Sequence, residues 1–326
     1  MQGKEASAIE PAAKCTAGID VGQDWLDVHV LPQEKKLRAP NTSEGVRQIK
    51  RFLNRFDVAL TVVEATGKWH RLTVRNLAAS GLPVAQTDPY RVRMFARAQG
   101  LFAKNDRLDA RVLAQFAAVM TPVSRPLTPV ALEGLQEIVT ARSSAVGMLT
   151  ALKNQKSAAQ DGFLKGDLRR RIFVLIKDIK RIEHEIRSRI DKEPEFQRRF
   201  GILTSIKGVG PITAMTLVAC LSELGATSAR AIAKLAGLAP HDDDSGKRHG
   251  PRTIWGGRSP VRRALYLSAF TAVRCNPQFK AFFSRLTARG LPFKAAVIAA
   301  ARKLAVLANT LIAQNRTWSP EPPKPA

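Results

Sequence analysis

The first 120 residues alternate short apolar runs with segments whose apolar residues recur every three or four positions. Short apolar runs are typical of buried strands, and the longer period is typical of amphipathic helices. The predicted strands are Thr16–Asp20, Trp25–Leu31, Val58–Val63 and Leu82–Ala85, and the predicted helices are Thr42–Phe56, Trp69–Ala79, Pro89–Ala98 and Asp106–Val119. This order predicts an α/β domain with a mixed sheet.

Three prolines, Pro122, Pro126 and Pro129, interrupt this pattern and predict a boundary. Beyond them, apolar residues recur at three and four positions as far as about residue 199, with a break near residues 160–166. Two long helices packed as an antiparallel coiled coil explain this pattern, and such an arm is typical of a spacer or an oligomerisation element.

The remaining sequence is predicted to be mostly helical, with one irregular basic stretch at residues 241–260, and it ends in a proline-rich tail. We therefore expect four parts. They are an α/β domain at residues 15–125, a helical arm at 126–199, a mostly α domain at 200–316 and a disordered tail at 317–326.

The charge balance indicates a class of partner. The chain has 52 Lys and Arg residues against 27 Asp and Glu residues, and residues 225–316 hold 16 basic and only 3 acidic side chains. An excess of this size on one segment is typical of nucleic-acid binding. A solubility bias or attraction to an anionic membrane surface is the alternative.

The cysteines and histidines exclude some classes of site. Cys15, Cys220 and Cys275 lie far apart, and the five histidines show no metal-ligand spacing, which argues against a disulfide framework or a zinc site. No apolar run is expected to reach membrane-spanning length, and the first residues lack a signal-peptide core. We expect a cytoplasmic protein with no membrane partner.

Four carboxylates suggest a metal site. Asp20 and Glu64 each end an apolar strand, and Asp106 and Asp109 lie three apart at the start of a helix. In an RNase H-like fold two such strands are neighbours and a late helix crosses their ends, which would gather oxygen ligands for hard divalent cations. Each acid alone is typical of a turn or a helix start. A cluster of four would repel itself, so we expect two Mg²⁺ ions.

A glycine-containing turn suggests phosphate binding. Lys207, Gly208 and Gly210 separate two apolar helical stretches and resemble the hairpin of a helix-hairpin-helix element. The backbone N–H groups of such a hairpin, with the following helix N-terminus, hold a phosphate. A plain turn between helices needs glycine equally, so both interpretations stay open.

A serine among arginines suggests covalent chemistry. Ser245 lies in a polar stretch, and the arginines that follow it are Arg248, Arg252, Arg258, Arg262 and Arg263. Guanidinium groups bind phosphate oxygens and stabilise the negative charge that develops when a serine attacks a phosphodiester. Most Ser-Gly pairs are simply turns. Asp242, Asp243 and Asp244 oppose phosphate binding unless they pair with arginines or hold metal.

Arg262 and Arg263 lie among residues that we expect to form the apolar face of a helix, namely Val261, Ala264, Leu265 and Leu267. The two arginines are therefore predicted to contact phosphate.

These motifs together resemble the insertion-sequence one-ten family of DEDD transposases, over about residues 15–316. The segments that carry the resemblance are Gly18–Val21, Val63–Gly67, Asn105–Ala110, Ile206–Pro211, Ser245–Gly246, Arg252–Arg258 and Val261–Tyr266. The resemblance implies a RuvC-like domain and a serine-bearing transposase domain. It maps the DEDD residues to Asp20, Glu64, Asp106 and Asp109, and the nucleophile to Ser245. In one respect the chain departs from the family, because Asp243 stands where a basic residue is usual.

The resemblance also implies partners. Family members act as oligomers, a dimer or a tetramer, in which domains of different protomers build one composite site. A structured guide RNA, called a bridge RNA, pairs with donor and target DNA. We therefore predict an RNA-guided DNA recombinase with a serine nucleophile. The alternatives are a RuvC-like junction nuclease that uses water as nucleophile, and a non-catalytic nucleic-acid-binding protein.

Overall fold

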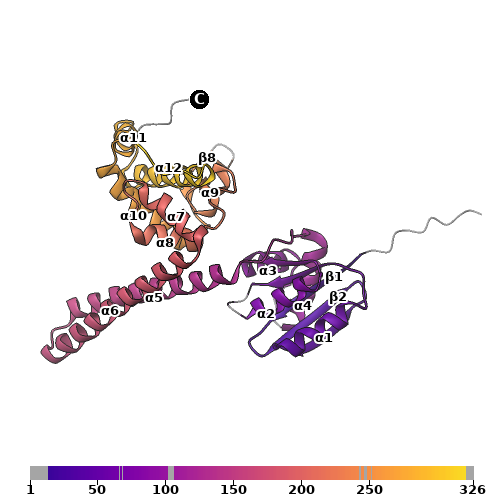
Figure 1. Ribbon diagram of the computed structural model, residues 1–326. Coiled ribbons are helices and arrows are strands. Elements are labelled where there is room, and N and C mark those ends of the chain that lie inside the picture. Colours follow the sequence, from indigo (N-terminus) through magenta and orange to yellow (C-terminus); the bar gives the residue numbers. More distant parts are fainter. Residues whose placement is uncertain are drawn as a thin grey trace, which may run out of the picture. The chain divides into compact units, whose positions relative to one another are not determined.

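The computed structural model describes residues 14–320, except residues 66, 68, 102–105, 242–243, 246–247 and 251. It describes no side chains at residues 106–108, 244–245 and 248–249. The chain divides into two compact units, one ending at Leu127 and the other beginning at Thr128. Figure 1 shows the helices and strands of each unit.

The N-terminal unit is built on a five-stranded sheet with the strand order β3-β2-β1-β4-β5. The strands are β1 (Cys15–Val21), β2 (Trp25–Leu31), β3 (Lys35–Pro40), β4 (Val58–Glu64) and β5 (Val84–Thr87). β1 pairs antiparallel with β2 and parallel with β4, so the central strand joins the two halves of a mixed sheet. The predicted α/β domain with a mixed sheet is confirmed.

Helices cover both faces of this sheet, namely α1 (Ser43–Leu53), α2 (His70–Ala79), α3 (Pro89–Ala98) and α4 (Asp106–Met120). Alternate strand residues point to opposite faces. On β1, Ala17 and Ile19 belong to the core cluster that contains the buried residues of α1 and α2, whereas Gly18 faces α4. A second cluster joins Val62 of β4 to α3 and α4.

Local sequence fixes the helix starts in this unit. The Thr42 hydroxyl accepts a hydrogen bond from the Gly45 N–H and caps α1. The Asp88 carboxylate accepts from the Tyr90 N–H, and Pro89 occupies the first position of α3, where its fixed φ suits a helix. The predicted Pro89–Ala98 helix has these bounds in the structure.

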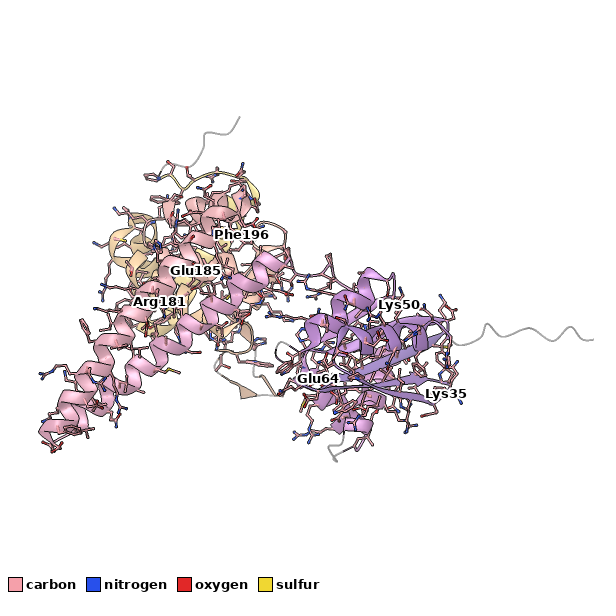
Figure 2. The ribbon with its side chains drawn as sticks, turned by 60° about the horizontal axis from the view of Figure 1, so that its bottom comes forward. Lys35, Lys50, Glu64, Arg181, Glu185 and Phe196 are labelled. Atoms are coloured by element: carbon pink, nitrogen blue, oxygen red, sulfur yellow. The ribbon has the colours of Figure 1, made fainter. Side chains whose placement is uncertain are left out.

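The C-terminal unit is mostly helical, as predicted. Its helices are α5 (Val130–Ala158), α6 (Gly162–Lys192), α7 (Pro194–Ser205), α8 (Pro211–Cys220), α9 (Ala229–Leu235), α10 (Ser259–Cys275), α11 (Pro277–Ala288) and α12 (Phe293–Ala313). The long helices α5 and α6 lie side by side and form the predicted arm (Figure 1). The exposed side chains of Arg181 and Glu185 mark the outer surface of α6 (Figure 2).

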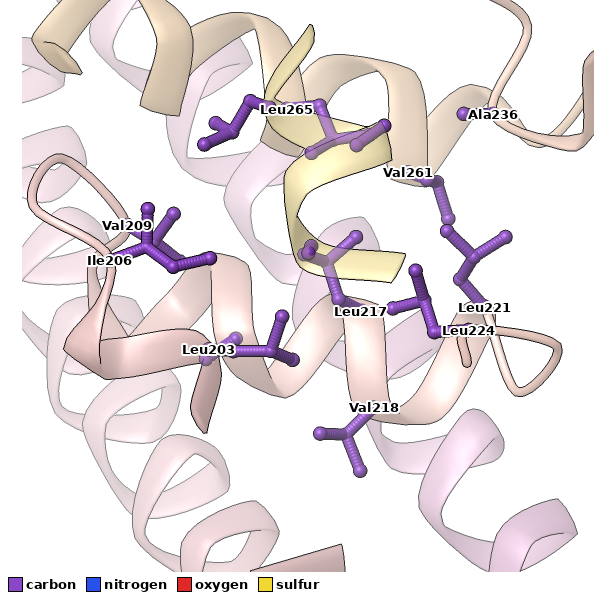
Figure 3. Close-up of a cluster of buried hydrophobic side chains, with 14 of the residues drawn as sticks. Leu203, Ile206, Val209, Leu217, Val218, Leu221, Leu224, Ala236, Val261 and Leu265 are labelled. Atoms are coloured by element: carbon purple, nitrogen blue, oxygen red, sulfur yellow. The ribbon is translucent and has the colours of Figure 1, made fainter. Parts of the chain in front are cut away.

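Helix α8 lies at the centre of this unit. All of its residues from Thr213 to Ala219 are buried, and Leu217 and Val218 belong to the same buried cluster as Leu203 of α7 and Leu265 of α10 (Figure 3). Leu135 and Ile186 at the base of the arm belong to the same cluster. The arm is therefore anchored in the core of the unit and does not hang from a flexible joint.

One expectation about apolar runs is wrong. α12 is long and apolar enough to cross a membrane by length and composition alone, but 56% of its most apolar part is buried within the protein. Ala300, Leu304 and Leu311 of this helix are fully buried in the core cluster of the C-terminal unit. The apolar character of α12 is thus explained by burial on most of its surface.

Three further details differ from the predictions. Strand β3 was not predicted, because Lys35–Pro40 is an edge strand in which three of the six residues are charged. Leu267 is 57% exposed, so the buried face of α10 is formed by Val261, Leu265, Ser268, Ala269, Ala272 and Val273 instead. The tail is ordered further than expected, since the Trp318 N–H donates to Ser205 Oγ at 2.8 Å. Residues 321–326 lie outside the described residues.

The approach of α4 to β1 generates a first prediction. A methyl group at Gly18 would lie 2.2 Å from the Ala110 carbonyl oxygen and 2.4 Å from the Ala114 nitrogen. Both are backbone atoms, so the helix has to move. We expect Gly18→Ala to destabilise the N-terminal unit by about 1–3 kcal/mol and to lower the hydrogen-exchange protection of α4. Urea unfolding and hydrogen exchange of the full chain measure both effects.

Gly147→Ala is the matched control, because Gly147 lies within α5 and no atom lies within 4 Å of the position that a methyl group would take there. It should leave stability unchanged or raise it by up to about 1 kcal/mol. If the two variants have the same free energy of unfolding and the same exchange in α4, the close contact at Gly18 does not contribute to stability.

Candidate active site

Two of the predicted acids lie at the ends of adjacent parallel strands. β1 and β4 pair with Ile19 opposite Val63, so the next residues along the two strands are Asp20 and Glu64. Each acid follows by two positions a residue that faces α4, Gly18 on β1 and Val62 on β4. Because side chains alternate along a strand, both acids lie on the α4 face of the sheet. Both are half-buried, and Figure 2 marks Glu64 at the end of β4.

The third acid is brought to this face by helix α4. Asp109 precedes Ala110, whose carbonyl oxygen lies against Gly18, and Asp109 is half-buried. The Thr16 hydroxyl donates to the Ala114 carbonyl oxygen at 3.0 Å and fixes the helix one turn further along. Asp106 begins the same helix, and its side chain lies outside the described residues. The structure therefore places Asp20, Glu64 and the start of α4 on one face of the sheet.

A second contact holds α4 to the β2–β3 hairpin. Arg111 of α4 forms an ion pair with Glu34 at 2.7 Å, and the other carboxylate oxygen of Glu34 lies 2.8 Å from His29 Nε2. A carboxylate only accepts hydrogen bonds, so Nε2 carries the proton. Burial lowers the pKa of His29 even though Glu34 raises it. The neutral, buried His29 thus orients Glu34 towards α4.

The chemistry of the acids fits a hard divalent cation, since carboxylate oxygens are the ligands that such ions prefer. Among the side chains that the structure describes, no group of three or more His, Cys, Asp or Glu residues is close enough to hold a metal ion. Asp106, the fourth predicted ligand, is not among them. The strand register and the position of α4 bring the acids to one face of the sheet. The described side chains alone do not form a complete set of metal ligands.

The predicted helix-hairpin-helix element joins α7 to α8. Gly208 has a φ of 110°, and a methyl group there would lie 2.6 Å from the Ala272 side chain of α10. The buried Asn276 donates to the Lys207 carbonyl oxygen at 3.2 Å. Lys207 and Gly210 are exposed, and α8 begins without a side-chain cap. Packing against α10 thus explains Gly208, and the exposed helix start remains compatible with phosphate binding.

Ser245 lies in a small hairpin within a larger one. Strand β6 (Pro240–His241) pairs with β9 (Thr253–Ile254), and between them β7 (Asp244–Ser245) pairs with β8 (Arg248–His249). The backbone of Ser245 is therefore opposite that of Arg248. The side chains of Ser245 and Arg248, together with residues Asp242 and Asp243, lie outside the described part of the chain.

The base of this double hairpin is fixed by a contact between two glycine-containing turns. Gly257 has a φ of 61°, and a methyl group there would lie 2.3 Å from the Gly237 nitrogen. The Arg258 N–H donates to the Leu235 carbonyl oxygen at 2.8 Å in the same region. His241 and Trp255 pack their rings with centroids 4.8 Å apart across β6 and β9. These contacts hold the ends of the serine-bearing segment.

Arg258 has a structural role that the sequence did not reveal. Its guanidinium donates two hydrogen bonds of 2.6 Å to Glu223 and one of 2.9 Å to the Cys220 carbonyl oxygen. Partial burial raises the pKa of Glu223, but the hydrogen bonds and charge of Arg258 outweigh burial and hold that pKa below its usual value. Arg258 therefore ties the start of α10 to the end of α8, and its predicted contact with phosphate stays untested.

The other predicted arginines lie near the surface. Arg252 and Arg263 are exposed and Arg262 is half-buried. Arg262 donates to the Gly256 carbonyl oxygen, which connects α10 to the base of the double hairpin. Sequence reasoning missed Glu223, Glu34 and His29. Only Glu34 and His29 carry a signal, their nearness in sequence, because Glu223 meets Arg258 through the fold alone.

Two family models match the chain. A DEDD transposase model of the IS110 type, described as "Transposase", matches residues 17–163. A second model, described as "Transposase IS116/IS110/IS902 family", matches residues 201–284. The first range contains the four acids, and the second contains Ser245 and the hairpin between α7 and α8.

Individual relatives agree with these matches. Pilin gene-inverting proteins of Moraxella bovis and Moraxella lacunata are 24% and 26% identical, over 94% of this chain and 98% of their own length. An IS110 protein of 43.6 kDa from Streptomyces coelicolor is 35% identical over 31% of this chain and 26% of its own length.

Among solved structures, T. thermophilus RuvC in complex with a Holliday junction substrate is similar in fold. The identity is 20% and the TM-score is 0.26, over 35% of this chain and 100% of the RuvC chain.

The ion pair of Arg258 generates a second prediction. The lowered pKa of Glu223 means that its stabilising effect is present above about pH 4.5 and is lost as the pH falls through the folded-state value. Because both side chains are about one third exposed, Glu223→Gln should cost only about 1 kcal/mol at pH 7. The difference from the wild type should become smaller as the pH falls from 7 to 3. Hydrogen exchange of peptides within residues 220–265 measures it.

Asp178→Asn is the control, since it removes an exposed pair with Arg181 on the arm of the same unit. It should change exchange in residues 220–265 at neither pH. A Glu223→Gln effect that is equal at pH 7 and pH 3 would contradict the electrostatic role of the pair.

Proposed function

Because the chain belongs to the IS116/IS110/IS902 family of transposases, we propose that it exchanges DNA strands through a covalent link to Ser245. It is a DNA transposase or recombinase. The observation that carries the proposal is the placement of Asp20, Glu64 and the start of α4 on one face of the sheet. Acids in this arrangement serve phosphodiester chemistry, and the net charge of +25 suits a nucleic-acid substrate.

Asp20, Glu64, Asp106 and Asp109 would hold divalent metal, which we propose to be two Mg²⁺ ions. Bound there, the ions would supply Lewis acidity towards a phosphate oxygen and neutralise the repulsion among the acids. The protein itself contributes the positions of the ligands. The contacts of α4 with Gly18, Thr16 and Glu34 keep Asp109 in place relative to the strand ends.

In the proposed reaction, the Ser245 oxygen forms a bond to phosphorus while the bond from phosphorus to a DNA oxygen breaks. The serine proton leaves to a base and the departing DNA oxygen takes up a proton. Attack by a hydroxyl of another DNA end then releases serine and restores a phosphodiester. His241 and His249 are candidates for the base by proximity in sequence, and an acid of the DEDD set contributed by another protomer is a third candidate.

The names of the relatives support this type of chemistry. The pilin gene-inverting proteins match nearly the whole chain, and inversion of a DNA segment requires that every cut end be joined again. A serine ester keeps the energy of the phosphodiester for that rejoining, whereas hydrolysis by water loses it. We further propose that a structured guide RNA selects the DNA sites, and that a dimer or tetramer builds the composite site. The 16 basic residues within 225–316, against 3 acidic ones, give this segment the positive charge that suits nucleic acids.

The metal proposal generates a third prediction. Asp20→Asn, Glu64→Gln and Asp106→Asn should each reduce strand exchange roughly a hundredfold or more, because each removes a charged ligand. Thermal unfolding should stay near that of the wild type. EDTA should abolish activity, and Mg²⁺ should restore it.

Asp24→Asn is the matched control, since Asp24 is an exposed carboxylate in the turn between β1 and β2. Its activity should equal that of the wild type. Near-normal strand exchange in EDTA would rule out the metal site.

The serine proposal generates a fourth prediction. Ser245→Ala should bind DNA normally but neither form a covalent adduct nor recombine, because no hydroxyl remains to attack phosphorus. A nicked suicide substrate traps the adduct, which appears as a denaturant-resistant, protease-sensitive shift on a gel. Ser284→Ala, which changes an exposed serine on α11, should form the adduct as the wild type does.

The alternatives give different results in this assay. Cutting by Ser245→Ala at the wild-type rate, with free DNA ends, would favour the junction nuclease that uses water. Binding without cutting by the wild type under every metal condition would favour a non-catalytic nucleic-acid-binding protein.

A further inference from the structure

The C-terminal unit contains a cavity of about 1140 Å³ at the base of the double hairpin. One wall is formed by Pro240 of β6, Ile254 of β9 and Arg252, which immediately precedes β9. Another wall is a stripe along α12, where Ala295, Ile298, Ala299, Arg302 and Val306 follow one another at helical spacing. The cavity therefore lies between the two ends of the serine-bearing segment and the last helix.

The polar lining of this cavity carries positive charge. Within the described part of the chain, its lining includes no acid and six cations: Arg252, Arg262, Arg263, Lys294, Arg302 and Lys303. Elsewhere in this unit some arginines are paired with acids, as Arg258 is with Glu223 and Arg199 is with Glu195. Six cations around one cavity raise the positive potential inside it, and such a cavity fits an anionic ligand.

The inner part of the cavity is apolar and partly aromatic. Tyr266, Phe282 and Ile298 are half-buried lining residues. The Lys303 ammonium lies 4.5 Å from the centre of the Phe282 ring and holds that ring at the cavity wall. The two small residues Ala295 and Ala299 leave room between the aromatic side chains and α12. A flat apolar group can enter here, which a fully ionic patch would not allow.

We propose that this cavity binds an unpaired nucleotide of a single-stranded nucleic acid. The base lies against Tyr266, Phe282 and the alanines of α12, and the flanking phosphates contact the arginines and lysines of the lining. A duplex keeps its bases paired and stacked, so only an unpaired strand presents both a free base face and adjacent phosphates. The volume of about 1140 Å³ leaves room for a base together with its sugar and flanking phosphates.

The site goes beyond the proposed strand exchange, because it needs neither metal nor the Ser245 hydroxyl. Its position gives it a use in that reaction. Pro240 and Arg252 are the lining residues at the two ends of the segment that carries Ser245. A nucleotide held here would keep an opened strand beside that segment.

The test is binding of fluorescent oligonucleotides, followed by anisotropy in EDTA and in a Ser245→Ala background, so that cleavage plays no part. The probes are one single-stranded DNA, the same strand with abasic residues, the blunt duplex and an RNA of the same sequence. The protein should bind the normal strand about tenfold or more tightly than the abasic strand, because stacking on the aromatic wall is lost. The RNA arm shows which sugar the site accepts.

Two cavity-filling variants, Ala299→Leu and Ala295→Leu, should bind the normal strand only as tightly as the unfilled protein binds the abasic strand. Ala288→Leu, at an exposed alanine of α11 outside the cavity, is the matched control and should bind as the unfilled protein does. Arg302→Gln should lower the slope of log affinity against log salt by about 0.7. Arg289→Gln, which removes an exposed charge outside the cavity, should lower it less.

The proposal is overturned if the protein binds normal and abasic strands equally, or if both cavity-filling variants bind like the unfilled protein while remaining folded by thermal unfolding. The proposal is also overturned if Arg302→Gln and Arg289→Gln lower the salt-dependence slope equally. The nucleic acid would then be attracted by the overall positive charge and not by the cavity. None of these outcomes depends on whether Ser245 is the nucleophile.

Discussion

The N-terminal unit depends on the direct contact between the backbone of α4 and the backbone of β1. Gly18 has no side chain to separate them, and the Ala110 carbonyl oxygen occupies the space that a methyl group would need. The Thr16 hydroxyl bond to Ala114 and the Arg111–Glu34 ion pair hold the same helix at two other points. The helix that carries Asp106 and Asp109 is thereby fixed against the central strand, beside the ends of β1 and β4, where Asp20 and Glu64 lie.

In the C-terminal unit, close backbone contacts at glycines likewise position the segment that carries Ser245. Gly237 and Gly257 let two turns touch through their backbones, and Arg258 joins the next helix to α8 through Glu223 and Cys220. Ser245 itself lies in a short two-stranded hairpin beyond this fixed base. A short hairpin with few backbone hydrogen bonds has little stability of its own. The rigid part of this unit thus sets where the serine-bearing segment begins and ends.

How much of this could be predicted depends on whether the decisive contact is local. Short apolar runs place Asp20 next to the last residue of β1 and Glu64 at the last residue of β4. The α3 bounds follow from Asp88 and Pro89, which act on the adjacent backbone. β3 was missed because an edge strand such as Lys35–Pro40 needs no apolar pattern. The role of Arg258 was missed because Glu223 lies 35 positions away. Leu267 was misassigned because an apolar residue on a helix does not reveal which face is covered.

The use of charge in the C-terminal unit shows the same limit. The sequence does not distinguish which of the arginines after Ser245 bind phosphate. In the structure, Arg258 is held by Glu223, and Arg262 has part of its guanidinium committed to Gly256. The cations that α12 adds, Lys294, Arg302 and Lys303, come from a helix whose apolar composition gave no hint of a nucleic-acid contact. The charge counted along the chain predicts the class of partner. The surface that binds the partner depends on the fold, which gathers some cations around one cavity and uses others in contacts within the protein.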